Sequence, residues 1–187
     1  MAVCVFASSS ARIDARYMAL ASELGTLLAR KQIDVVFGGG GVGLMGKLAD
    51  AVISSGGKIT GVIPRFMKEA GWDHSAVKNM IVTEDMSERK RKMFSLSDSV
   101  IALPGGIGTL EELAEALTLK QLGQFNVPIV VVNIMDFYKP LFDFFDSMID
   151  GCFMMAEHRE MWKVATSPEE ALQHLVCRQE WAGIAKI

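Results

Sequence analysis

Short apolar segments alternate with longer amphipathic segments along this chain. The short segments carry an apolar side chain at nearly every position, which is typical of strands buried on both faces. The longer ones carry apolar residues three or four positions apart, which is typical of helices with one buried face. The expected strands span 2–8, 33–40, 58–64, 80–85, 99–104 and 128–133, and the expected helices span 15–31, 43–57, 86–97, 109–123, 138–150 and 167–177.

This alternation predicts one doubly wound α/β domain over residues 1–187, a Rossmann-like parallel sheet with helices on both faces. Residues 65–79 show no regular pattern, and 162–167 form only a short segment. Ser167 and Pro168 have the residue types of an N-cap and a first-turn proline for the last helix. Because ligands of such sheets bind beyond the carboxyl ends of the strands, near a reversal in strand order, we expect a site there.

Composition narrows the function classes. Apolar residues make up 50% and charged residues 22% of the 187, and the net charge of −3 argues against broad nucleic-acid or membrane-surface binding. No apolar run approaches the roughly 18 residues of a membrane span, and the first ten residues do not resemble a signal peptide. We therefore expect a cytoplasmic protein with no metal or other cofactor. Its cysteines form no metal-binding spacing with its histidines: Cys4, Cys152 and Cys177; His74, His158 and His174.

Residues 38–46, "GGGGVGLMG", follow an expected strand and open an expected helix. From Gly41 they read GxGxxG, but no acid ends the next strand, so a nicotinamide dinucleotide is not favoured. Gly41, Gly46 and Lys47 also approach a P-loop, but Leu48 stands where Ser or Thr would bind Mg²⁺. A tight turn explains some of the glycines. Four in a row exceed what a turn needs and favour phosphate binding at the helix N-terminus.

A pair of basic residues follows in "DMSERKRKMFSLSD". Arg89 and Lys90 share one helix face with Met86 and Met93, so this face is expected to turn inward. Buried cations need an anionic partner, either a protein carboxylate or a bound phosphate. The alternative is a solvated basic helix with snorkelling side chains.

Residues 103–113, "LPGGIGTLEEL", place three glycines before another expected helix. Thr109 and Glu112 have the spacing of a capping box, and Glu111 has the charge that a helix N-terminus favours. Glu112 is therefore either a cap or an acid–base group. The helix dipole would keep it ionised, which suits a base or a cation-stabilising group.

These segments resemble one known family. "PGGIGTLEE" fits PGGxGTxxE, the signature of the Lonely Guy cytokinin-activating phosphoribohydrolases, and "VFASSS", "FGGGGVGLMG", "GVIP", "ERK" and "LTLKQLG" agree with the family in order. The resemblance extends over roughly residues 3–155. Such sequences have also carried a lysine decarboxylase label, which no lysine in a pyridoxal-phosphate context supports here.

The resemblance implies hydrolysis of the N-glycosidic bond of a nucleoside 5′-monophosphate, giving free base and ribose 5-phosphate. It implies a homodimer with the site near the subunit interface, and it implies that Arg89 and Glu112 are catalytic. In the mechanism that the resemblance implies, Glu112 stabilises the cation that develops on the ribose or activates the attacking water. Arg89 orients Glu112, and Lys90 neutralises the phosphate. The residues implied to bind substrate are Ser8, Gly39, Gly40, Gly43, Lys90, Gly105, Gly106, Ile107, Gly108, Thr109, Leu110, Glu111 and Thr118.

The chain departs from the family pattern at Ser87, Gly71 and Leu119, where histidine, an acid and tryptophan are common. These positions fall where the base would be held, so the preferred base stays open between a cytokinin and adenine or another purine. Two other classes also stay open: a module that senses a nucleotide without turnover, and a nicotinamide-dependent oxidoreductase.

Overall fold

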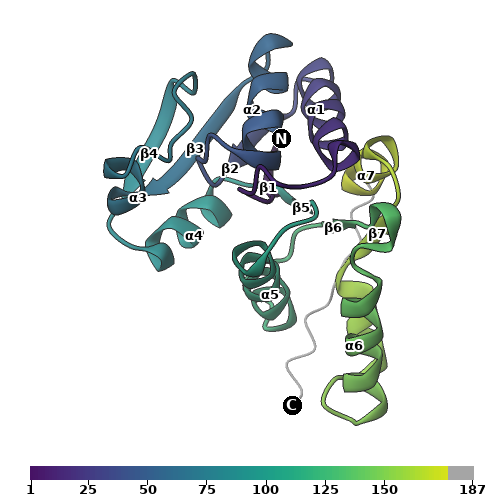
Figure 1. Ribbon diagram of the computed structural model, residues 1–187. Coiled ribbons are helices and arrows are strands. Elements are labelled where there is room, and N and C mark those ends of the chain that lie inside the picture. The colour runs from purple at the N-terminus through teal and green to yellow at the C-terminus, as the bar shows by residue number, and fades with distance from the viewer. Residues whose placement is uncertain (177–187) are drawn as a thin grey trace.

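A computed structural model describes residues 1–176, so the prediction of a thiol at Cys177 lies outside the described residues. A parallel sheet runs through the molecule in the order β4-β3-β2-β1-β5-β6-β7 (Figure 1). Its strands are β1 Ala2–Phe6, β2 Asp34–Phe37, β3 Ile59–Pro64, β4 Asn79–Thr83, β5 Ser99–Ala102, β6 Ile129–Val132 and β7 Lys163–Ala165. The helices are α1 Ala15–Arg30, α2 Gly43–Ser54, α3 Arg65–Glu69, α4 Met86–Ser95, α5 Ile107–Gln121, α6 Lys139–Asp150 and α7 Pro168–Val176, with 3₁₀ helices η1 Ile134–Asp136 and η2 Ala156–Met161.

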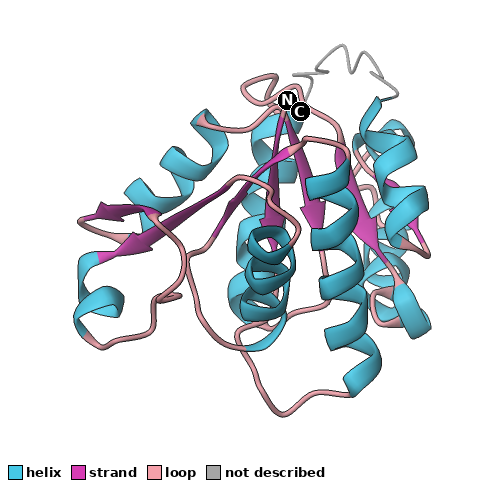
Figure 2. Cartoon of the chain, turned by 90° about the horizontal axis from the view of Figure 1, so that it is seen from above, coloured by secondary structure: helices cyan, strands magenta, loops and turns pink. Residues whose placement is uncertain are grey.

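Helices cover both faces of the sheet, which confirms the predicted doubly wound α/β fold (Figures 1 and 2). In β1, Val3 and Val5 pack into a core cluster with α1, α2 and α7. Cys4 and Phe6 point to the other face and pack into a cluster with α4 and α5. Because both sets are fully buried, a central strand has to be apolar at every position, and this is the pattern that the sequence carries.

The strand order reverses between β1 and β5. The chain first adds β2, β3 and β4 on one side of β1, then returns and places β5 on its other side, with Cys4 opposite Val100. The loops that leave β1 and β5 therefore diverge to opposite faces and open a crevice at the carboxyl ends of the strands.

Two details of the prediction changed. Residues 162–167, expected only as a short segment, contain the strand β7. Residues 65–79, which show no regular pattern, contain the five-residue α3. The predicted cap of α7 is confirmed, because the Glu170 N–H donates to the Ser167 hydroxyl over 3.2 Å and Pro168 is the first helical residue. Within residues 1–176, no helix is long and apolar enough to cross a membrane.

Candidate functional site

A cavity of about 640 Å³ lies at the carboxyl ends of β1, β2, β3 and β5, where the strand order reverses. It is lined by three segments that follow strands (7–10, 38 with 40–42, and 106–109) and by side chains from α3 and α4. The N-termini of α2 and α5 both meet it. Neither helix has a side-chain cap, so their first-turn N–H groups make this end of the sheet suited to an anion.

The loop after β5 is held from two sides. The Tyr138 hydroxyl donates to the Leu103 carbonyl over 2.8 Å, and the Ser8 N–H donates to the Pro104 carbonyl over 3.3 Å. The second bond joins the loops after β1 and β5 directly. The entrance to α5 is therefore fixed against the first strand of the fold.

The glycines of residues 38–46 serve close packing as well as the cavity. A Cβ on Gly46 would lie 2.5 Å from the Gly41 carbonyl oxygen, and a Cβ on Gly43, whose φ is +69°, would lie 2.7 Å from the Ser8 carbonyl oxygen. Gly40 and Gly41 line the cavity. Lys47 is exposed on α2 and does not line it, so the loop lacks the inward lysine of a P-loop.

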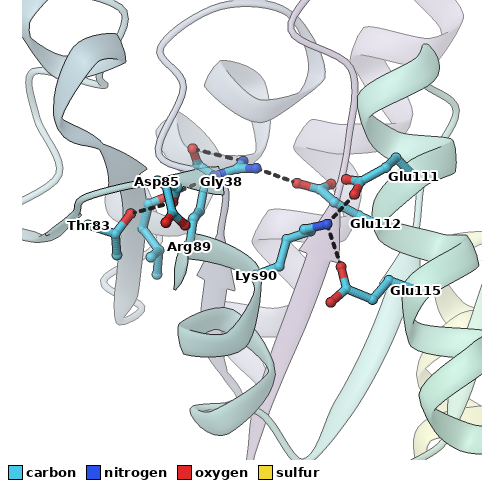
Figure 3. Close-up of polar contacts among 9 residues, drawn as sticks. Gly38, Thr83, Asp85, Arg89, Lys90, Glu111, Glu112 and Glu115 are labelled. Carbon is cyan, nitrogen blue, oxygen red and sulfur yellow. Dashed lines mark hydrogen bonds and ion pairs between the residues drawn. The ribbon is translucent and has the colours of Figure 1, made fainter. Parts of the chain in front are cut away.

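Arg89 enters the site from α4, which begins at an Asp85 cap that accepts the Glu88 N–H over 2.7 Å. Arg89 is 5% exposed, and Figure 3 shows its guanidinium reaching across the ends of the strands toward α5. It donates from Nε to the Val62 carbonyl (3.0 Å), from Nη2 to the Gly38 carbonyl (3.2 Å) and from Nη1 to Glu112 Oε1 (2.7 Å). The inward orientation predicted for the basic pair is confirmed, and its partner on this side is a protein carboxylate.

Glu112 does not cap its own helix, so the capping box predicted for Thr109 and Glu112 is wrong. Helix α5 begins at Ile107, two residues earlier than expected, with Gly106 as its N-cap. Thr109 thus lies inside the first turn, and Glu111 and Glu112 lie in the second turn, too far on to reach the free N–H groups. The buried Thr109 side chain packs over Gly105, where an added Cβ would lie 2.1 Å from Thr109 Oγ1.

Burial raises the pKa of the Glu112 carboxyl, and the charge and hydrogen bond of Arg89 oppose that shift. The helix dipole was expected to keep Glu112 ionised, which would lower its pKa. Desolvation acts in the opposite direction and is the largest influence on this pKa. A carboxyl with a raised pKa that is held by a cation and faces a cavity is a candidate acid–base group. Burial also raises the pKa of the Cys4 thiol beneath the site, so Cys4 is a neutral thiol and not a nucleophile.

Lys90 turns inward beside Arg89 but meets different partners. Figure 3 shows its amine between Glu111 and Glu115 of α5, with which it forms ion pairs. Burial alone would lower the pKa of Lys90, but the two carboxylates raise it. These pairs tie α4 to α5 beside the bond between Arg89 and Glu112, so Lys90 helps to hold the two helices together.

The structure brings part of the implied site together. The residues of that set that line the cavity are Ser8, Gly40, Arg89, Gly106, Ile107, Gly108, Thr109 and Glu112. Those outside its lining are Gly39, Gly43, Lys90, Gly105, Leu110, Glu111 and Thr118. Thr118 is exposed on α5, where its hydroxyl donates to the Ala114 carbonyl over 2.8 Å. Contact between these outer residues and a substrate stays a prediction.

The sequence did not identify the apolar part of the lining. Val42, Met67, Trp72 and Met86 all face the cavity, and so does Gly71, one of the three departures from the family pattern. Met67 and Trp72 come from the segment without regular pattern, where no periodicity marked them. The signal that could have marked this part of the lining is Trp72 itself, a large aromatic residue within an otherwise polar stretch.

The fold and this cavity define a class of protein: a doubly wound α/β protein with a buried guanidinium–carboxylate pair at its switch point. The chain matches the family model described as "Possible lysine decarboxylase" over residues 45–175. It is 39% identical to the Arabidopsis thaliana cytokinin riboside 5′-monophosphate phosphoribohydrolase LOG1, over 92% of this chain and 81% of the relative. It is also 39% identical to the probable enzyme LOGL2 of Oryza sativa subsp. japonica, over 92% of this chain and 71% of the relative. The chain belongs to this Lonely Guy (LOG) family, as its motifs predicted.

Solved structures with the same fold include molybdenum cofactor proteins. The carrier protein of Chlamydomonas reinhardtii has a TM-score of 0.69 at 24% identity, covering 94% of this chain and 98% of that one. The binding protein of Rippkaea orientalis has a TM-score of 0.67 at 25% identity, covering 92% and 91%. At 24% identity, the likeness to the Chlamydomonas reinhardtii protein shows the fold alone.

Proposed function

We propose that this protein hydrolyses the N-glycosidic bond of a nucleoside 5′-monophosphate, releasing the free base and ribose 5-phosphate. The relatives at 39% identity are named for this reaction on cytokinin riboside 5′-monophosphates. The observation that carries the proposal is the buried pair of Arg89 and Glu112, joined over 2.7 Å and lining a cavity beside the N-terminus of α5.

The 5′-phosphate binds at the N-terminus of α5. The N–H groups of Ile107, Gly108 and Thr109 belong to its first turn, and the helix dipole adds partial positive charge there. Gly106 and Gly108 support this role, because a Cβ added to either meets no atom within 4 Å and the backbone is open to close approach. Holding the phosphate positions the ribose over Glu112.

Glu112 acts on the water that attacks the sugar. As the bond from C1′ to the base nitrogen breaks, its electron pair leaves with the base and C1′ gains cationic character, as in glycoside hydrolysis. Glu112 stabilises that cation and accepts a proton from the water, whose hydroxyl bonds to C1′. The leaving nitrogen of the base takes up a proton from solvent and Glu112 returns its own to solvent, so the products are the neutral base and ribose 5-phosphate. Arg89 fixes the carboxylate from one side, so the second carboxylate oxygen is the one that serves the reaction.

The finer assignments are also part of the proposal. The protein acts on purine nucleotides that include cytokinin forms, and it acts as a homodimer with its site near the subunit interface. It acts in the cytoplasm, and this is supported by Cys4 and Cys152, both of which are free thiols.

The test is a panel of nucleoside 5′-monophosphates, including AMP and N6-isopentenyl-AMP, assayed for free base. Glu112→Gln keeps an acceptor for Arg89 and should retain the fold, while kcat falls by about 10²- to 10⁴-fold. Glu69→Gln, an exposed carboxylate on α3, is the matched control and should leave kcat unchanged. Full turnover in Glu112→Gln would exclude Glu112 as the acid–base group.

A second candidate is binding of a phosphorylated ligand without turnover. It is favoured by the likeness of the fold to the Rippkaea orientalis protein, whose name describes binding of the molybdenum cofactor. Calorimetry on the wild-type protein separates the two candidates. Nucleotide binding with no base released under any condition of the panel would select this candidate.

A further inference from the structure

Trp72 is a large aromatic residue that the fold leaves exposed at the cavity. Its side chain lines the cavity, yet the residue is 57% exposed. Large apolar side chains seldom remain this open in a concave site without a ligand to cover them. The mechanism above gives Trp72 no role.

The backbone at Trp72 is fixed from both sides. Its N–H donates to the Met67 carbonyl over 3.1 Å, and its carbonyl accepts the Gly41 N–H over 3.0 Å. The neighbouring Asp73 forms an antiparallel bridge with Gly40. Gly71, at φ +73°, supplies the left-handed turn that reverses the chain after α3 and directs Trp72 to the cavity. The indole therefore stands on a rigid support, although it lies in a segment with little regular structure.

The wall around Trp72 is apolar. Val42, Met67 and Met86 line the same cavity, and within residues 1–176 its only charged lining side chains are Arg89 and Glu112. The hydroxyl side chains of the lining come from the loop after β1 (Ser8, Ser9 and Ser10) and from the first turn of α5 (Thr109). Apart from Arg89, the side chains that α3 and α4 contribute to the cavity are the methionines Met67 and Met86, so this side offers flexible apolar contacts.

We infer that Trp72 stacks on the nucleobase of the substrate and determines which bases this site accepts. The inference rests on the proposed function and names the base-binding part of that site. Phosphate and ribose occupy the polar end at α5, so the base lies toward the apolar end. Stacking favours the two-ring purines over pyrimidines, because a purine covers more of the indole. A wall of methionine and tryptophan accepts a base that carries an apolar substituent, and it discriminates only weakly against a base that lacks the substituent.

The experiment compares Trp72→Ala and Trp72→Phe with Phe66→Ala. Phe66 is 52% exposed on α3 but does not line the cavity, so its variant is the matched control. Steady-state kinetics are measured with AMP, N6-isopentenyl-AMP and CMP, and inhibition is measured with ribose 5-phosphate, which lacks a base.

In Trp72→Ala, KM for AMP and for N6-isopentenyl-AMP should rise about 10- to 100-fold, the range expected for loss of one base–aromatic stack. The kcat values should stay within about threefold, because stacking is present in ground state and transition state alike. Inhibition by ribose 5-phosphate should be unchanged. Trp72→Phe should recover most of the loss, Phe66→Ala should match wild type, and the wild-type preference for AMP over CMP should shrink in Trp72→Ala.

Several results would overturn the inference. One is an unchanged KM in Trp72→Ala. A second is an equal loss for ribose 5-phosphate, which would place Trp72 at the sugar phosphate. A third is a changed oligomeric mass in sedimentation with unchanged KM, which would make Trp72 an interface residue. If the wild-type protein releases no base, the proposed function fails, but calorimetry with AMP and ribose 5-phosphate on the same variants still tests the stack.

Discussion

Replacing Arg89 with methionine removes the cation that partners Glu112 while keeping a long apolar side chain. Arg89 makes three buried hydrogen bonds, to the Val62 carbonyl, the Gly38 carbonyl and Glu112. Arg89→Met leaves Glu112, itself 6% exposed, without its buried counter-charge, at a cost of about 3–5 kcal/mol. This is a large part of the roughly 5–15 kcal/mol that stabilises a typical domain.

The loss of stability in Arg89→Met should depend on pH. Whether the loss grows or shrinks as pH rises follows from the change in the pKa of Glu112. Burial already raises this pKa, and the Arg89 guanidinium opposes the rise, so the variant raises it further. The folded variant then holds a proton that the unfolded chain has released, and stability is lost as pH rises toward the folded-state pKa. Arg89→Met should therefore be less destabilised near the ordinary pKa of a glutamate, about pH 4.3, than at neutral pH.

Urea unfolding followed by circular dichroism measures the free energy of unfolding and its dependence on pH. Arg91→Met, an exposed arginine on the same helix, is the matched control and should change stability by less than about 0.5 kcal/mol. Combining Arg89→Met with Glu112→Gln should remove most of the pH dependence, because the titrating group is gone. A loss in Arg89→Met that is the same at both pH values would refute the reasoning.

Two further predictions concern the loop after β5 and a buried lysine. Gly105→Ala places a methyl group 2.1 Å from Thr109 Oγ1 and should cost about 1–3 kcal/mol in thermal or urea unfolding. Gly108→Ala, in the first turn of α5 with open space around it, should be neutral or stabilising by up to about 1 kcal/mol, and equal losses in both variants would contradict the packing argument. Burial lowers the pKa of Lys120 to about 8, so wild-type stability should rise with pH above about 8. In Lys120→Met this rise should be flatter when the unfolding free energy is measured across that range, and an unchanged slope would exclude Lys120 as its source.

Local patterns predicted most of the fold, because the central strands of this sheet are buried on both faces and have to be apolar at nearly every position. The run at 99–104 contains β5, and the run at 33–40 contains β2. Helix α3 escaped prediction, because five residues with no buried side chain leave no apolar stripe. The start of α5 was misplaced, because Gly106 and Gly108 look like turn residues, yet Gly108 is in the first helical turn.

The candidate site was only partly predictable. The inward face of Arg89 and Lys90 follows from helical spacing, and the helix N-termini follow from the glycine loops. The sequence could not assign the partners, and Lys90 meets Glu111 and Glu115. Residue spacing alone favoured a capping box for Glu112, and only the mechanism implied by the family resemblance paired Glu112 with Arg89.

By itself, then, the sequence determined the alternation of strand and helix, the two glycine loops and the family. These depend on residue types a few positions apart, where burial and backbone sterics act locally. The tertiary structure decided that Arg89 meets Glu112, 23 positions away, and that Trp72 reaches the loop at Gly41. Such contacts depend on strand order and on how each helix packs on the sheet. Only the folded chain brings the two charges into one buried pair and leaves the Trp72 side chain exposed at the same cavity.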